Sequence, residues 1–267
     1  MTTPSAVWRD VVHIREIAPL VHNITNYVVM NTTANALLAI GASPVMAHAI
    51  DEVEDLVRLA GALVINIGTL SPAWVDAMFC AGREASKKGI PIVLDPVGAG
   101  ATPYRTDTAQ RLGREVSPAI IRGNASEIRA LVQADATTRG VDSTHSTEES
   151  VEHARRVAGQ YRCAVSMSGA IDIIVFRDAT TRVSNGHPIM PRITGLGCTA
   201  TALTGAFAAV NPSAFDAAVH AMIVTGIAGE IAAERAAGPG SFWGHFLDAL
   251  YALQESDITT RMRASDR

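Results

Sequence analysis

The chain has 267 residues, of which 48% are hydrophobic and 18% charged, which is enough apolar material for the core of one domain over residues 1–267. Its net charge of −4 arises from acidic and basic residues that are scattered along the chain. This distribution argues against a nucleic-acid partner, because proteins of that class carry a concentrated basic patch.

Membrane insertion and secretion are also disfavoured. The apolar residues 217–229 are fewer than the ~20 that a membrane span needs, and they include His220, so they predict a buried helix and no membrane contact. The three cysteines lack a CxxC spacing, and the first residues lack the pattern of a signal peptide. The sequence therefore favours the cytoplasm.

Short apolar runs alternate with helical patterns along the chain. The runs predict strands over residues 20–24, 44–47, 62–67, 91–94, 119–121, 163–167 and 172–176. The helical patterns cover residues 29–40, 52–60, 72–88, 107–116, 125–132 and 147–161. This alternation predicts an α/β fold with a mostly parallel central sheet and helices on both faces.

The second half of the chain departs from this alternation. Residues 171–177 and 182–184, separated by residues 178–181, predict a hairpin at one edge of the sheet. After Cys198 the sequence predicts only helices, over residues 214–237 and 242–254.

Residues 194–199 form a glycine-punctuated turn that leads directly into a helical pattern. Gly195 and Gly197 let the backbone approach a ligand closely, and a helix start presents unpaired N–H groups, which together favour an anion site. Cys198 falls in the first turn, where the same field would lower the pKa of a thiol and favour thiolate. The turn is equally typical of a helix packed closely on a sheet, with a buried and inert cysteine.

Polar residues at the carboxyl ends of predicted parallel strands are the candidates for ligand contacts. Asp95 ends a buried strand and could hold a hydrated Mg²⁺, or act only as a turn cap. Arg122 precedes a helix whose third position carries Glu127, as in an ordinary capping box. Ser168 could contact a nucleotide or simply form a turn.

Only Lys87 and Lys88 are lysines, so any phosphate chemistry must depend on arginine, helix starts and a metal.

Two more strand ends, at Asn26 and Met46, are ambiguous from chemistry alone. Asn26 lies in the asparagine-rich residues 22–26, which also suit turn formation, and Met46 is typical of core packing. Taken with the other strand ends, however, these segments resemble one family. The resemblance to hydroxyethylthiazole kinase rests on residues 22–31, 43–46, 95–99, 122–128 and 195–198 and extends roughly from Leu20 to the last helix.

This resemblance implies a ribokinase-like fold and ATP-dependent phosphorylation of the hydroxyl of 4-methyl-5-(2-hydroxyethyl)thiazole in thiamine salvage. It implies Mg²⁺ and a homotrimer whose sites lie between subunits. By position, the residues implied are Met46, Gly195 and Asn26 for the thiazole, Arg122 and Ser168 for ATP, Asp95 and Glu127 for the metal, and Cys198 with Gly195 and Gly197 for catalysis.

Cys198 stands where most ribokinase-like relatives have aspartate, so its role as a proton acceptor stays open. Phosphoryl transfer depends more on positioning and charge neutralisation than on a strong base, and the N–H groups of residues 195–198 would supply part of both. Two alternatives remain. One is a nucleotide-dependent hydrate dehydratase of the same fold, against which Cys198 argues. The other is a sensor that binds without catalysis, against which Asp95 and Glu127 argue.

Overall fold

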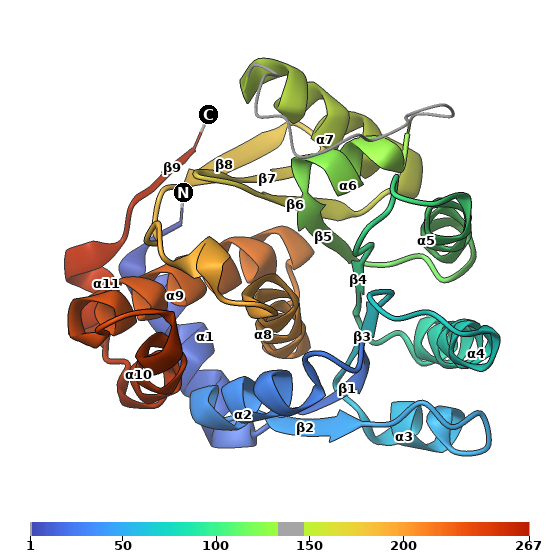
Figure 1. Ribbon diagram of the computed structural model, residues 1–267, viewed down its shortest axis with the longest axis horizontal. Coiled ribbons are helices and arrows are strands. Elements are labelled where there is room, and N and C mark those ends of the chain that lie inside the picture. Colours follow the sequence, from blue (N-terminus) through green and yellow to red (C-terminus); the bar gives the residue numbers. More distant parts are fainter. Residues whose placement is uncertain (1, 133–146, 267) are drawn as a thin grey trace.

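A computed structural model describes residues 2–132 and 147–266, and these residues form one sheet with helices on both faces (Figure 1). The sheet has nine strands in the order β2-β1-β3-β4-β5-β6-β7-β8-β9 within the described residues. The strands are β1 Leu20–Ile24, β2 Ser43–Met46, β3 Ala62–Asn66, β4 Ile92–Asp95, β5 Ile120–Asn124, β6 Ala164–Ser168, β7 Asp172–Phe176, β8 Ala179–Val183 and β9 Ala264–Asp266. The pairs from β2 to β6 are parallel and those from β6 to β9 antiparallel.

The helices divide between the two faces of the sheet (Figure 1). One face carries α3 Val53–Leu59, α4 Pro72–Lys88, α5 Pro103–Glu115, α6 Ala125–Ala130 and α7 Thr147–Tyr161. The other carries α1 Pro4–Ile17, α2 Met30–Ile40, α8 Leu196–Val210, α9 Ala214–Arg235, α10 Pro239–Ala252 and α11 Glu255–Arg261. Each face has its own apolar core, as expected for a parallel sheet whose strands are buried on both sides. The α/β prediction is confirmed.

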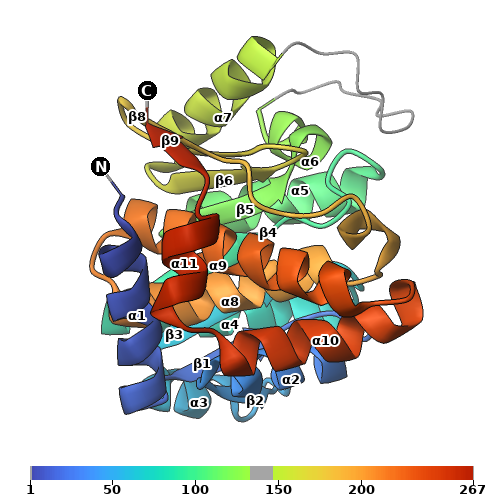
Figure 2. The same ribbon diagram turned by 90° about the vertical axis from the view of Figure 1, so that its left-hand side faces the viewer.

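Helix α8 occupies the centre of the second face. It packs on β1, β3 and β4, while α1, α10 and α11 lie further out (Figure 2). Helix α9 is long and apolar enough to cross a membrane, but 78% of its apolar stretch is buried inside the structure. The prediction of a buried helix over residues 217–229 is therefore confirmed.

Local capping signals placed several helix ends correctly. Helix α4 begins at Pro72 because the side chain of Ser71 accepts a hydrogen bond from Trp74 N, and it ends at Lys88 because Gly89 adopts a left-handed conformation. The predicted start of the next helix at Asp107 is wrong. Helix α5 begins at Pro103, since the Thr102 side chain caps Arg105 N and proline suits the first helical position.

The predicted hairpin is present, since β7 and β8 pair antiparallel, but two details predicted for the second half of the chain are wrong. Strand β8 begins at Ala179, because Arg177 takes a φ of 53° and allows a turn shorter than residues 178–181. The chain after Cys198 is not all helix, since β9 pairs antiparallel with β8. Contacts between distant segments hold β9 there: Arg263 N donates to Asn185 Oδ1 at 2.8 Å, and Ser184 N donates to Arg263 O at 2.8 Å.

Helix α1, for which the sequence analysis made no prediction, is tied to α9 by a buried polar pair. Oδ2 of Asp10 lies 2.6 Å from Nδ1 of His220 and accepts a hydrogen bond from Asn211 Nδ2 at 2.6 Å. Burial raises the pKa of Asp10, but the hydrogen bonds from His220 and Asn211 outweigh burial and hold it below its usual value. The ionised form of Asp10 therefore stabilises the contact between α1 and α9.

Replacing Asp10 by asparagine should lower the free energy of unfolding at neutral pH by about 1–3 kcal/mol, because a buried hydrogen-bonded charge is lost. A lowered pKa means that this contribution is present above the ordinary value of 3.8 and is lost as the pH falls through the folded-state pKa. Urea unfolding of both proteins near pH 7 and near pH 3 should show the difference shrinking in acid. Asp178→Asn, in the exposed hairpin turn, is the control, and an equal difference at both pH values would contradict the prediction.

Candidate active site

The carboxyl ends of the parallel strands meet the first turn of α8. This helix begins after Gly195, whose φ of 85° is left-handed, and a Cβ at Gly195 would lie 2.5 Å from Val29 Cγ1. Glycine is therefore required at this position by both conformation and space. Within the described part of the chain, no acceptor takes the N–H groups of Gly197 and Cys198, so both are available to a ligand.

Gly197 differs from Gly195. Its φ is not left-handed, and a Cβ there would find only Arg122 Nη1, at 3.8 Å, within 4 Å. Since neither conformation nor packing demands glycine, the open space beside these N–H groups suits a bound phosphate, which needs close approach to the backbone.

Arg122 lies beneath this turn. Its side chain is buried in the middle of β5, and Nη1 donates to Gly197 O at 2.9 Å and to Thr201 Oγ1 at 3.4 Å. The guanidinium thus fixes the backbone of the α8 start and places a positive charge next to it.

Asp95 ends β4 and is fully enclosed. Its Oδ2 accepts hydrogen bonds from Thr201 Oγ1 at 2.7 Å and from Asn66 Nδ2 at 2.9 Å. Burial, together with the charge of Glu127, raises the pKa of Asp95 to about 7, while Arg122 and the two hydrogen bonds act in the opposite direction. A positive ligand next to this carboxyl would favour its ionised form.

Glu127 forms the predicted capping box of α6. Its Oε2 accepts from Asn124 N at 2.8 Å, and its Oε1 accepts from Gly98 N at 2.9 Å in the loop after β4. The described residues contain no cluster of three or more His, Cys, Asp or Glu side chains that could hold a metal. Asp95 and Glu127 nevertheless repel each other as carboxylates, and such a pair fits Mg²⁺, which binds through one or two carboxylates together with phosphate oxygens.

Cys198 is the next residue on the α8 turn, and the prediction of a lowered thiol pKa is wrong. Burial raises the pKa of Cys198 to about 11, and the charge of Asp95 adds to this effect. Hydrogen bonds from Asn66 and Asn26 and the charge of Arg122 offset only part of the rise. The thiol is therefore neutral at physiological pH, because burial beside a carboxylate outweighs the favourable position at a helix start.

Asn26 lies in this cluster, and the structure adds two residues that the sequence analysis missed. Asn26 Nδ2 donates to Cys198 Sγ at 3.5 Å and to Asn66 Oδ1 at 2.8 Å. Asn66 and Thr201 are the additions, and both are buried. Asn66 is a polar residue closing an apolar strand, which was a usable signal, whereas Thr201 stands among many small residues of α8 and gave none.

Ser168 and Met46 lie at the carboxyl ends of two strands that are far apart in the sheet, β6 and β2. Ser168 ends β6, and its Oγ donates to Gly123 O at a long 3.4 Å. Met46 ends β2, is half-buried and packs against the core beneath α8. Tyr27 and Val28, in the loop after β1, are 67% and 61% exposed, so the edge of the site carries unusual apolar surface.

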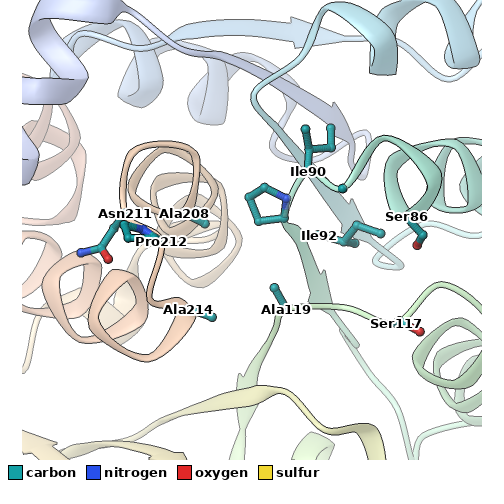
Figure 3. A pocket seen from close by; sticks show the side chains of 11 residues that line it. Ser86, Ile90, Ile92, Ser117, Ala119, Ala208, Asn211, Pro212 and Ala214 are labelled. Carbon is teal, nitrogen blue, oxygen red and sulfur yellow. The ribbon is translucent and has the colours of Figure 1, made fainter.

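A cavity of about 420 Å³ lies elsewhere, at the opposite ends of β4 and β5 (Figure 3). Its lining includes Ile90, Pro91, Ala119 and Pro212, and the described residues around it carry no ionisable side chain. A site for phosphoryl transfer would need charged groups, so the cluster at the strand ends, and not this hollow, is the candidate active site.

Comparison with known proteins identifies the family. Residues 11–256 match the model of the hydroxyethylthiazole kinase family. The chain belongs to the hydroxyethylthiazole kinase family. It is 60% identical over 262 residues to the hydroxyethylthiazole kinase of Syntrophus aciditrophicus (strain SB), which covers 98% of this chain and 97% of the relative.

Solved structures agree with this family assignment. The hydroxyethylthiazole kinase of Pyrococcus horikoshii OT3 has a TM-score of 0.92 at 43% identity, with 98% of this chain and 99% of the other covered. A ribokinase-like superfamily protein of Enterococcus faecalis V583 has a TM-score of 0.64 at 13% identity, covering 90% and 87%, which shows the shared fold alone. The predicted ribokinase-like fold and family resemblance are confirmed, and a kinase is favoured over the lyase and sensor alternatives.

The two glycines of the α8 turn should respond differently to alanine in this hydroxyethylthiazole kinase family member. Gly195→Ala should lower the free energy of unfolding by about 1–2 kcal/mol or more, because of the left-handed φ and the contact with Val29. Gly197→Ala should unfold like the wild type, since alanine favours a helix and meets little there, but should weaken MgATP binding at least about tenfold. Thermal unfolding and calorimetric titration measure both effects. Unchanged MgATP affinity in Gly197→Ala would show that phosphate does not use this space.

Proposed function

We propose that this chain transfers the γ-phosphoryl group of ATP to the hydroxyl of 4-methyl-5-(2-hydroxyethyl)thiazole, in thiamine salvage. The observation that carries the proposal is the α8 start, where free N–H groups of Gly197 and Cys198 stand over the buried Asp95. This arrangement combines an anion site with a carboxylate for a metal, and family membership supports the thiazole as acceptor.

The nucleotide would bind through Arg122 and Ser168 as well as the α8 start. Arg122 is held against Gly197 O at 2.9 Å and places its charge where negative charge develops on the transferring group. Ser168 ends the neighbouring strand, and among the described residues its hydroxyl makes only a long hydrogen bond. Its hydroxyl is thus available to ATP.

Mg²⁺ would be held by Asp95 and Glu127 together with phosphate oxygens. Among the described residues, both side-chain hydrogen bonds to the Asp95 carboxyl fall on Oδ2, which leaves Oδ1 to a ligand. When bound, the metal supplies charge neutralisation for the phosphates. The protein residues orient this carboxyl through Asn66 and Thr201 and keep it out of bulk water.

The acceptor would lie among Met46, Asn26 and Gly195. These residues offer a thioether, an amide and bare backbone but no charge, which suits a neutral heterocycle better than an already phosphorylated substrate. Cys198 has a neutral thiol next to the reacting groups. It would orient the substrate hydroxyl. As the new bond to phosphorus forms, the sulfur would take the hydroxyl proton while its own S–H proton passes to a phosphate oxygen, so the thiol ends the step neutral.

The assembly we propose is a homotrimer with sites between subunits, built from one kinase domain over residues 1–267 and working in the cytoplasm, without nucleic-acid or membrane partners. The exposed Tyr27 and Val28 support a partner subunit here, because they project apolar surface beside the proposed thiazole residues. The proposed number of subunits, three, rests on the family resemblance.

The substrate is tested directly by ADP release. Purified protein with MgATP should phosphorylate the thiazole alcohol and leave hydroxymethylpyrimidine largely untouched, because the site residues match the thiazole family. Mass spectrometry of the products identifies the phosphate ester. Comparable turnover of both alcohols, or of the pyrimidine alone, would refute the assignment.

Cys198→Ala should lower kcat by about 10²-fold, the lower end for lost proton transfer, with little change in the Michaelis constant for ATP. Cys198→Asp should keep substantial activity, since it supplies a carboxylate of nearly the same volume. Because the thiol pKa is raised to about 11, wild-type kcat should show no thiol titration between about pH 7 and 9. Steady-state kinetics of the three proteins between about pH 7 and 9 tests these expectations. If Cys198→Ala and the wild type have the same kcat at every pH, Cys198 takes no part in proton transfer.

Light scattering should give a particle of three 28.1 kDa chains at assay concentrations. Replacing Tyr27 by a charged residue should weaken the assembly and the activity together, because burying an unpaired charge in an interface is costly. A charge at Tyr104, which is also exposed but lies on α5, is the control. A fully active monomer would contradict sites shared between subunits.

A further inference from the structure

Four side chains from four different segments form a continuous polar chain across the site. Asn66 Nδ2 donates to Asp95 Oδ2 at 2.9 Å, Asn26 Nδ2 donates to Asn66 Oδ1 at 2.8 Å, and the same Asn26 nitrogen donates to Cys198 Sγ at 3.5 Å. Asn66 is 1% exposed and faces Asp95 in the register of β3 and β4. It is the member that connects the carboxylate to the rest.

The backbone fixes the direction of both amides. Gly68 N donates to Asn66 Oδ1 at 2.9 Å, and Val28 N donates to Asn26 Oδ1 at 3.1 Å. An amide oxygen accepts and an amide nitrogen donates, so neither side chain can be reversed without facing N–H against N–H. The donor ends must then point toward Asp95 and Cys198.

The packing allows little freedom around this arrangement. A Cβ at Gly68 would lie 2.6 Å from Asn26 Nδ2, so the absence of a side chain there makes room for the amide. Because Asn26 donates to the sulfur, Cys198 acts as the acceptor on this side, and its S–H must be directed to another group.

We propose that Asn66 is a positioning residue, which orients the Asp95 carboxylate with its nitrogen and, through Asn26, the Cys198 thiol with its oxygen. Its role in turnover rests on the proposed function, whereas its effect on the thiol does not. An apolar residue in its place would strand the Gly68 N–H and the Asn26 donor in a buried site, and an aspartate would set two carboxylate oxygens against each other.

Two substitutions of Asn66 test the hydrogen bonds made by its amide nitrogen and its amide oxygen. Asn66→Ala removes both contacts, while Asn66→Asp keeps acceptors for Gly68 N and Asn26 but loses the donor to Asp95. Asn23→Ala is the matched control, since Asn23 is a buried asparagine of β1 whose nitrogen donates to Val21 O, outside the chain of four. Thermal unfolding verifies that each variant is folded.

Two readouts are needed: steady-state kinetics with the thiazole alcohol and MgATP, and the infrared S–H stretching band of Cys198, identified by its loss in Cys198→Ser. Both Asn66 variants should lower kcat by about 10–100-fold, as for lost partners of metal ligands, with the Michaelis constant for ATP nearly unchanged. Asn66→Ala should also shift the S–H band, and Asn66→Asp should shift it too, because the lost amide donor also acts on the thiol. Asn23→Ala should leave kcat and the S–H band at their wild-type values.

Wild-type kcat in Asn66→Ala, or a lowered kcat with an unmoved S–H band, would overturn the proposal. If Asn66→Ala does not fold, Asn26→Ala must shift the band, and an unmoved band there has the same meaning. If the wild-type protein does not phosphorylate the thiazole alcohol, the proposed function fails, and the band in Asn66→Ala still decides whether Asn66 positions the thiol.

Discussion

The burial of the Asp95 carboxylate is the constraint on which the rest of the site depends. A charge at the end of an internal strand is costly unless its oxygens are hydrogen-bonded or a cation lies close by. Asn66 and Thr201 supply the hydrogen bonds, and Arg122 supplies part of the charge. These three come from β3, α8 and β5, so satisfying one carboxylate fixes the relative positions of three elements.

The same constraint explains the form of the α8 turn. Arg122 can serve Asp95 only from beneath the helix, and there it donates to Gly197 O, a carbonyl of the first turn. The turn approaches the arginine closely because Gly195 adopts a left-handed conformation that packs against Val29. The anion site and the metal carboxylate are therefore parts of one structure, and a change in either should be felt by the other.

Sequence reasoning was accurate at several helix ends that are determined locally, although it missed the local Thr102 cap that starts α5. The Ser71 and Gly89 caps and the Asn124–Glu127 capping box are read from neighbouring residues, and the structure has all of them. It failed where distant segments decide: β9 exists because Arg263 meets Asn185 and Ser184, and no local pattern in three residues announces it. Asn66 gave a local signal, as a polar residue that closes an apolar strand, but its role depends on partners 29 and 40 positions away.

The thiol of Cys198 shows why a correct motif can give wrong electrostatics. The helix start was identified, but the sequence did not show that the sulfur would be buried beside Asp95, and these two effects dominate its pKa. A neutral thiol is nevertheless consistent with phosphoryl transfer. Once a bound cation favours the ionised form of Asp95, this carboxylate and Glu127 bring negative charge to a site that must receive a polyanion, and a thiolate would add to it. A residue that stays neutral until the acceptor proton leaves avoids this repulsion, because a loose transition state needs little help from a base before bond formation.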